Sequence, residues 1–279
     1  MPPDTAPSPL LSVRNLVARF PSRGRSFLKP RPPITAVDDV SFTIDAGETL
    51  GLVGESGSGK TTVGRAVLRL VHAEGSITYD GIDVLAAHRT AMRRLRRRMA
   101  IVFQDPGGSF NPRIRIGETV GEPMLVHGIA TDPQVRREKV EQLLERCGMP
   151  RSCIDHYPHE FSGGQRQRIG IARALASEPR FIVCDEPTSA LDVSIQAQIL
   201  NLLSDLQRDL GLSYLFISHD MAVVRHMCSR IAVMRAGKIV EQGPRDQIIE
   251  SPREPYTKAL LSAVPEAVPR RRTIAAAPG

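Results

Sequence analysis

The chain has 279 residues and a formal net charge of +7, with 41% hydrophobic and 24% charged residues. This composition is ordinary for a globular protein that is long enough to bury a core. No stretch approaches the roughly 20 apolar residues of a membrane-spanning helix, and the start of the sequence lacks the basic segment and apolar run of a secretory signal. We therefore expect a protein that stays in the cytoplasm and meets a membrane only through a partner.

The cysteines and the basic residues give little support to zinc, disulfide or nucleic-acid sites. The four cysteines are scattered without a C-x-x-C pair, which argues against a zinc site and a disulfide framework. Six arginines lie between Arg89 and Arg98, at a spacing that predicts a helix with a solvated basic face. Because few aromatic residues lie nearby to stack on bases, this run gives little support to nucleic-acid binding.

Short apolar runs recur along the first hundred residues. Residues 11–17 and 37–44 alternate partly, as half-buried strands do, and residues 49–53 are a short apolar strand. Residues 60–70 carry apolar side chains at helical spacing. The pair Asp80-Gly81 between two short apolar runs predicts a hairpin. Residues 21–33, rich in proline and arginine, predict a surface loop.

The sequence pattern changes at residue 105. Residues 105–161 read as mostly helical, with Asp132 as N-cap and Pro133 in the first turn of one helix. Strands and helices then alternate: strands are predicted at 181–184, 214–217 and 231–234, and helices at 165–177 and 195–210. Short apolar strands interleaved with helices predict a mainly parallel sheet covered on both faces.

A glycine-rich loop follows the strand at 49–53 and fits the pattern G-x-x-x-x-G-K-[ST]. It comprises Gly54, Glu55, Ser56, Gly57, Ser58, Gly59, Lys60 and Thr61, and Thr62 follows. Backbone N–H groups and the helix N-terminus of such a loop bind phosphate, its lysine reaches the β- and γ-phosphates, and its hydroxyl ligates Mg²⁺. The pattern predicts binding of ATP or a related nucleotide with Mg²⁺, and by itself leaves kinases, GTPases and motors open.

A second acidic element follows the apolar run at 181–184. Asp185 stands where a carboxylate holds Mg²⁺ from across a phosphate site. Glu186 comes next and is a candidate to orient or deprotonate an attacking water. Alone, this acidic pair is equally well explained as an ordinary polar strand end, so its interpretation depends on the other motifs.

The segment Phe161-Ser162-Gly163-Gly164-Gln165-Arg166-Gln167-Arg168 resembles the LSGGQ signature of ABC ATPases, with Phe161 in place of leucine. Its small residues predict a bare N-terminus for the helix starting near Gln165, which would be a second anion site. The resemblance implies that Ser162, Gly163, Gly164 and Gln165 face the γ-phosphate of ATP bound to another subunit. ATP would then be sandwiched only in a dimer.

Other segments follow in the order of the same family. Gln104 resembles the Q-loop glutamine, Asp192 lies in a segment that resembles the D-loop, and His219 resembles the switch histidine. Phe20 is similar in placement to the aromatic residue that stacks on adenine. The resemblance implies catalytic roles for Lys60, Gln104, Glu186 and His219, and Mg²⁺ ligation by Thr61, Gln104 and Asp185.

Two segments sharpen the resemblance. Residues 105–113 and 251–265 are similar to the ATPases of oligopeptide and dipeptide importers, some of which carry an iron–sulfur cysteine cluster in their C-terminal region. No cysteine follows Cys228 here, so no such cluster is expected. Import of nickel or glutathione stays open as cargo. A nucleic-acid-directed soluble ABC ATPase is a less favoured alternative, because such proteins usually fuse two ATPase domains or insert coiled coils.

The resemblance implies a complete architecture and setting. We expect an α/β fold with a RecA-like P-loop NTPase core, an antiparallel β element and a helical ABC signature subdomain. The ATPase domain would span residues 1–250 with its helical insert at about 106–163, and a C-terminal extension would span 251–279. Expected partners are integral membrane permease subunits, a second ATPase subunit (a copy or a paralogue) and, indirectly, a substrate-binding protein, at the cytoplasmic face of the inner membrane. No nucleic acid is expected as a partner.

Overall fold

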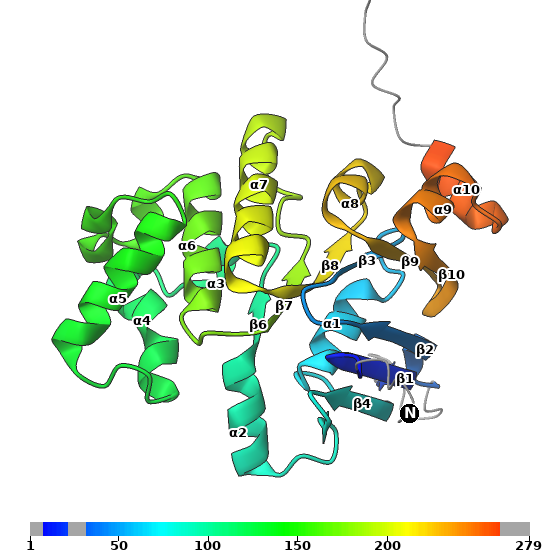
Figure 1. Ribbon diagram of the computed structural model, residues 1–279, viewed down its shortest axis with the longest axis horizontal. Helices are drawn as coiled ribbons and strands as arrows, with labels where there is room; N and C mark the ends of the chain where they lie inside the picture. The colour runs from blue at the N-terminus through cyan, green and yellow to red at the C-terminus, as the bar shows by residue number, and fades with distance from the viewer. Residues whose placement is uncertain (1–7, 22–31, 263–279) are drawn as a thin grey trace, which may run out of the picture.

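The computed structural model describes residues 8–21 and 32–262 (Figure 1). Most of the predicted loop at 21–33 and the end of the C-terminal extension, residues 263–279, lie outside the described residues.

The strands are β1 Leu11–Phe20, β2 Ile34–Ile44, β3 Thr49–Val53, β4 Glu74–Tyr79, β5 Ile82–Asp83, β6 Met99–Val102, β7 Phe181–Asp185, β8 Ser213–Ser218, β9 Arg230–Arg235 and β10 Lys238–Pro244. The helices are α1 Lys60–Val67, α2 Arg89–Arg98, α3 Pro106–Ser109, α4 Ile116–Val126, α5 Pro133–Arg146, η1 Arg151–Asp155, η2 Pro158–Glu160, α6 Gly163–Leu175, α7 Val193–Leu210, α8 Met221–Met227, α9 Arg245–Glu250 and α10 Pro255–Ser262.

The larger sheet has the strand order β10-β9-β3-β8-β7-β6. All neighbours from β9 to β6 pair in parallel, and β10 is antiparallel to β9. Every residue of β3, β7 and β8 is buried, which explains their continuous apolar sequences, because helices and strands cover both faces of a parallel sheet. The predicted α/β fold with a mainly parallel sheet is confirmed.

Alternate residues of the central strands enter two different cores. In β8, Leu215 and Ile217 pack with α1 and the smaller sheet, whereas Tyr214 and Phe216 pack with α6, α7 and α8. This separation follows from the two-residue period of a strand. Helix α1 contacts both sheets and therefore lies between them (Figure 1).

The smaller sheet is antiparallel throughout, in the order β2-β1-β4-β5. It is the predicted antiparallel β element. Asp80 and Gly81 have positive φ angles of 49° and 77°, as the predicted tight hairpin between β4 and β5 requires.

Between β6 and β7 the chain forms helices, which lie together at one side of the molecule (Figure 1). Asp132 is the N-cap of α5, and its carboxylate accepts a hydrogen bond of 2.9 Å from the Val135 N–H, as predicted. Whether residues 106–163 form a separate subdomain stays a prediction.

The basic run forms helix α2, and two residues of this helix, Met92 and Leu95, are buried. The arginines of α2 lie on its solvated side or pair with neighbouring acids, as Arg98 does with Asp80 at 2.7 Å. All four cysteines are buried and free. In the described part of the chain, no helix is long and apolar enough to cross a membrane.

Replacing Asp132 by alanine is expected to lower the free energy of unfolding by about 1 kcal/mol, because the Val135 N–H loses its capping acceptor. Asp192 is the matched control: it is the N-cap residue of α7, but its side chain accepts no capping hydrogen bond. Urea denaturation of both variants measures the difference. Equal losses for Asp132→Ala and Asp192→Ala would contradict the capping role.

Candidate functional site

The glycine-rich loop connects β3 to α1, as its pattern predicts. Gly59 is the N-cap residue of α1 with φ 105°, and no side chain caps this helix. The first N–H groups of a helix have no intrahelical partner, and they attract anions together with the helix dipole. The N-terminus of α1 is therefore available to a phosphate group.

Two glycines of this loop are required by the protein's own backbone. A Cβ atom on Gly54 would lie 2.1 Å from the Met234 carbonyl oxygen, and one on Gly59 would lie 2.2 Å from that of Ala36. Both distances are far below contact, so any other residue would displace the loop. The loop therefore packs tightly against β2 and β9 at these two glycines.

Lys60 is buried, with 4% of its surface exposed. Its ammonium donates hydrogen bonds of 2.7 Å to the carbonyl oxygens of Gly54 and Glu55. Burial lowers the pKa of Lys60, and nearby carboxylates, chiefly those of Glu186 and Asp185, oppose this shift. The lysine is thus held inside its own loop, next to the uncapped end of α1.

Thr61 and Asp185 meet across the site. The Thr61 hydroxyl donates a hydrogen bond of 2.8 Å to Asp185 Oδ1, which joins the start of α1 to the end of β7. Asp185 is 3% exposed, and burial raises its pKa, while the hydrogen bond from Thr61 opposes the shift. Two of the three predicted metal ligands therefore lie together, whereas the third, Gln104, bonds to Glu186.

Glu186 follows β7 in a left-handed conformation, with φ 49°. Such a conformation is uncommon for a residue with a side chain, and here the Glu186 N–H donates to the Ile217 carbonyl at 3.0 Å. Its Oε2 accepts a hydrogen bond of 3.2 Å from Gln104 Nε2 and lies 3.1 Å from His219 Nδ1. Gln104, which follows β6, and His219, which follows β8, thus converge on one carboxylate oxygen of Glu186, which follows β7.

The signature segment differs from the sequence expectation in one respect. Helix α6 begins at Gly163, and its N-terminus is not bare. Ser162 Oγ accepts from the Gln165 N–H at 3.3 Å, and Gln165 Oε1 accepts from the Ser162 N–H at 2.9 Å. This capping box was legible in the sequence as a serine followed by glutamine three residues later.

The signature segment contacts α7. A Cβ on Gly164 would lie 2.5 Å from Ile195, and one on Gly163 would lie 3.6 Å from Leu191. Asp192, the predicted D-loop aspartate, is exposed immediately before α7. In the described part of the chain, no hydrogen bond joins the signature segment to the phosphate loop.

Phe20 lies at the end of β1, paired with Ile34, and is 37% exposed. Its contact with adenine stays a prediction.

One contact of the phosphate loop was not anticipated. The Glu55 N–H donates a hydrogen bond of 3.1 Å to the hydroxyl of Tyr256, which belongs to α10. The two residues are 201 positions apart, and no local pattern in the sequence could indicate their proximity.

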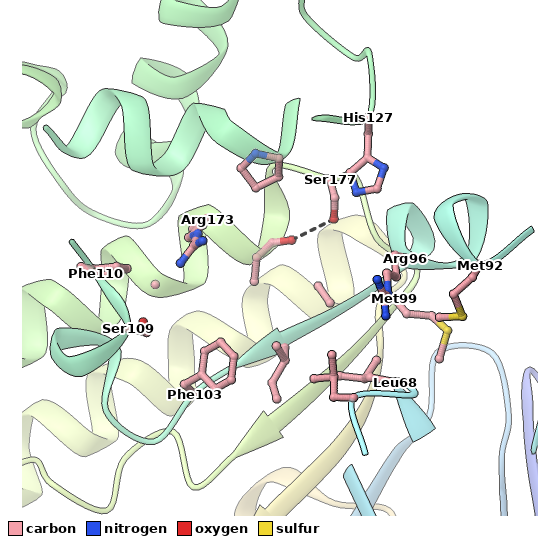
Figure 2. A pocket seen from close by; sticks show the side chains of 16 residues that line it. Leu68, Met92, Arg96, Met99, Phe103, Ser109, Phe110, His127, Arg173 and Ser177 are labelled. Atoms are coloured by element: carbon pink, nitrogen blue, oxygen red, sulfur yellow. Dashed lines mark hydrogen bonds between the residues drawn. The ribbon is translucent and has the colours of Figure 1, made fainter. Parts of the chain in front are cut away.

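A cavity of about 370 Å³ lies beside the site, between α2, β6, α4 and α6 (Figure 2). Figure 2 shows Phe103 and Leu68 along one side, Met92 and Met99 at one end, and His127 across from them. Burial, together with neighbouring arginine charges, lowers the pKa of His127. The cavity begins at Phe103, one residue before Gln104.

Replacing Asp185 by asparagine is expected to raise the melting temperature of the ligand-free protein near about pH 7. Because burial raises the pKa of Asp185, the folded state holds its proton more tightly than the unfolded state does. The contribution of Asp185 to wild-type stability is therefore greatest below the ordinary aspartate pKa and is lost as the pH rises through the raised value. The asparagine variant avoids that loss.

Thermal melts without nucleotide or Mg²⁺, from about pH 4 to pH 8, test this expectation, and the gap between variant and wild type should close at the acidic end. Asp205→Asn is the control, because the Asp205 side chain is 57% exposed. A variant that melts below wild type at neutral pH would refute the interpretation.

Known proteins resemble this chain both in sequence and in structure. The family model described as ABC transporter matches residues 37–189, and the model described as oligopeptide/dipeptide transporter, C-terminal region, matches residues 240–279. A structure of the dimeric cassette MJ0796 in a post-hydrolysis state bound to ADP and Pi has a TM-score of 0.74 and 28% identity, covering 84% of this chain and 98% of that one. The structure of cbiO1 from Clostridium perfringens has a TM-score of 0.73 and 26% identity, covering 87% of this chain and 91% of that one.

Curated relatives are more similar in sequence. A putative peptide import ATP-binding protein of Brucella ovis is 52% identical over 267 residues, which are 95% of this chain and 82% of that protein. The glutathione import ATP-binding protein GsiA of Pectobacterium atrosepticum is 50% identical over 276 residues. This chain spans only 44% of the length of that second protein. The chain belongs to the ABC transporter family, as one of its ATP-binding cassettes, the ATPases that drive transport.

Proposed function

We propose that this chain hydrolyses MgATP at a site shared with a second cassette, and so drives import of oligopeptides or dipeptides through membrane permease subunits. The observation that carries the hydrolytic part is the convergence of Gln104, Glu186 and His219 beside the phosphate loop. A cassette that only bound nucleotide would have no need of a positioned carboxylate at this point.

Each side chain has a distinct part in the proposed reaction. Lys60 and the N–H groups at the start of α1 bind the phosphates and stabilise the charge that develops on them. Glu186 orients the attacking water and accepts its proton. Gln104 and His219 hold the Glu186 carboxylate in place through their contacts with Oε2.

The residues present fit a bound Mg²⁺ ion. Thr61 Oγ1 and Asp185 Oδ1 lie 2.8 Å apart, and both are the oxygen ligands that Mg²⁺ prefers. No cluster of three or more His, Cys, Asp or Glu side chains suited to a metal occurs among the described residues. Phosphate oxygens and water would therefore complete the coordination, as is usual for Mg²⁺ at nucleotide sites. When bound, the ion would neutralise charge on the β- and γ-phosphates, and Gln104, which contacts Glu186, is the third ligand that we propose.

A second cassette would supply Ser162, Gly163, Gly164 and Gln165 to the γ-phosphate. The capping box does not prevent this. Ser162 Oγ accepts a hydrogen bond in the cap, so its own proton is free to be donated to an anion. The position of the segment against α7, with no hydrogen bond to the phosphate loop among the described residues, also favours action on another subunit's nucleotide.

The cavity between α2, β6, α4 and α6 is the surface we assign to a permease segment. Its lining is mainly apolar, and Leu70, one of the lining residues, is 50% exposed. Phe103 borders the cavity, and the next residue, Gln104, contacts Glu186. A permease segment seated in this cavity would contact Phe103, and the next residue, Gln104, contacts the Glu186 carboxylate. Movement of the segment would therefore be transmitted to the proposed hydrolytic site.

Peptide cargo is supported by the family match over residues 240–279 and by the relatives named for peptide import. The relative named for glutathione import is of similar identity, but only part of its length is matched. We favour oligopeptides or dipeptides, and place the chain peripherally at the cytoplasmic face of the inner membrane.

Replacing Glu186 by glutamine is expected to lower the kcat of Mg²⁺-dependent ATP hydrolysis at least about 100-fold, since the amide cannot accept the proton of water. ATP binding should persist, and the variant should form an ATP-dependent dimer on size-exclusion chromatography. Lys60→Ala is the companion variant, with ATP affinity about 10-fold to 100-fold weaker because a charged donor to phosphate is lost. Equal hydrolysis rates in wild type and Glu186→Gln would overturn the proposed mechanism.

Purification of the tagged full chain from its native membranes tests the cargo. Integral membrane subunits should co-purify, and ATP hydrolysis by the reconstituted complex should rise when binding protein and a dipeptide or oligopeptide are added. Parallel arms contain glutathione and Ni²⁺. Stimulation by either of these without stimulation by peptide would refute peptide import while leaving the ATPase assignment intact.

A further inference from the structure

Among the described residues, helix α10 makes one hydrogen bond to the phosphate loop. Tyr256 of α10 accepts it from the Glu55 N–H at 3.1 Å, and only 9% of the Tyr256 surface is exposed. Glu55 itself is exposed, so the hydrogen bond is partly buried, with the enclosed tyrosine on its acceptor side. Loss of the hydroxyl would leave the Glu55 N–H without its partner in the fold.

The peptide unit that makes this contact also holds the lysine. The N–H of Glu55 and the carbonyl of Gly54 belong to the same planar peptide. Its N–H end bonds to Tyr256, and its carbonyl end accepts a hydrogen bond of 2.7 Å from Lys60 Nζ. Rotation of this one peptide would break both contacts. Tyr256 is therefore separated from the phosphate-binding ammonium by a single rigid group.

Tyr256 is itself firmly placed. The guanidinium of Arg235 lies over its ring, 4.9 Å from the centroid, which is within the range of a cation–π contact. Arg235 follows Met234, whose carbonyl leaves room only for glycine at position 54. The end of β9 thus contacts both the tyrosine and the start of the phosphate loop.

The start of α10 is fixed by a second anchor. Glu241 of β10 accepts hydrogen bonds from the N–H groups of Arg253 and Glu254, at 2.8 and 3.3 Å. These N–H groups precede a helix whose first donors have no intrahelical partner. The carboxylate therefore holds the helix that carries Tyr256 on the edge strand next to β9.

We propose that Tyr256 is a positioning residue for nucleotide binding: its hydroxyl fixes the Gly54–Glu55 peptide, and through it the Lys60 ammonium, in the orientation that receives phosphate. This inference rests on the nucleotide site proposed above and extends it to the C-terminal extension. The extension then has a direct part in ATP affinity, in addition to its packing on the core.

Tyr256→Phe tests the proposal in the full chain, because it removes the hydroxyl and keeps the ring beneath Arg235. A fluorescent ATP analogue should bind about 2-fold to 10-fold more weakly, the loss that corresponds to one hydrogen bond. The KM for ATP should rise by a similar factor, and kcat should fall by less. Tyr79→Phe is the matched control, since the Tyr79 hydroxyl donates to the Arg98 carbonyl at 3.2 Å, away from the loop. Its affinity for the analogue should equal that of wild type.

Tyr256→Ala separates positioning from stability. It loses the ring as well as the hydroxyl, so both its melting temperature and its nucleotide affinity should fall. Tyr256→Phe should restore most of the melting temperature but not the affinity. If Tyr256→Phe binds the analogue as wild type does, or more tightly, the positioning role is refuted. If wild type itself fails to bind the analogue, the proposed nucleotide site fails instead.

Discussion

Parallel pairing of β3, β8, β7 and β6 is the constraint on which the rest of the molecule depends. In that register Val53 lies opposite Ser218, Asp185 opposite Ile217, and Val102 opposite Cys184. The carboxyl ends of all four strands therefore meet at one edge of the sheet, where open α/β sheets bind ligands. The phosphate loop, Asp185 with Glu186, His219 and Gln104 each follow one of these ends.

The same arrangement places opposite charges in a poorly solvated site. Burial disfavours the charged form of both Lys60 and Asp185, so their pKa values shift in opposite directions. Carbonyl oxygens of the loop and the Thr61 hydroxyl offset part of this cost. A ligand that brings negative phosphate to Lys60 and a divalent cation to Asp185 would relieve the remainder. The ligand-free site is thus less stable than an apolar one would be, as expected of a site built for binding.

The two helix N-termini assigned to phosphate are built differently. That of α1 has no side-chain cap and follows a glycine in a left-handed conformation, whereas that of α6 has a complete capping box. Helix α1 therefore has unsatisfied donors next to Lys60, and α6 is stable before any ligand arrives. This difference suits a division in which one helix end belongs to a subunit's own nucleotide site and the other is presented ready-formed to a partner.

Periodicity and turn chemistry were sufficient for most of the fold. Buried strands such as β7 and β8 are continuous apolar runs, and the Asp132 cap and Asp80-Gly81 hairpin depend on residues adjacent in sequence. Strand β10 and helices α8 and α9 were not predicted. The two helices have only seven and six residues, too few to show a clear helical period. The residues of β10 are also polar and half exposed, so they carry no clear period.

The functional site likewise has features that the sequence determined and features that only the tertiary structure decided. Residue types and their spacing determined the phosphate loop, because this motif is local and its chemistry follows from its own atoms. The roles of the acidic strand end and of the signature segment came from the resemblance to a known family. Only the tertiary structure decided that Gln104 and His219 share one oxygen of Glu186, and that Tyr256 bonds to the peptide whose carbonyl accepts from Lys60. These contacts join residues brought together by sheet register and helix packing, which no single segment of the chain specifies.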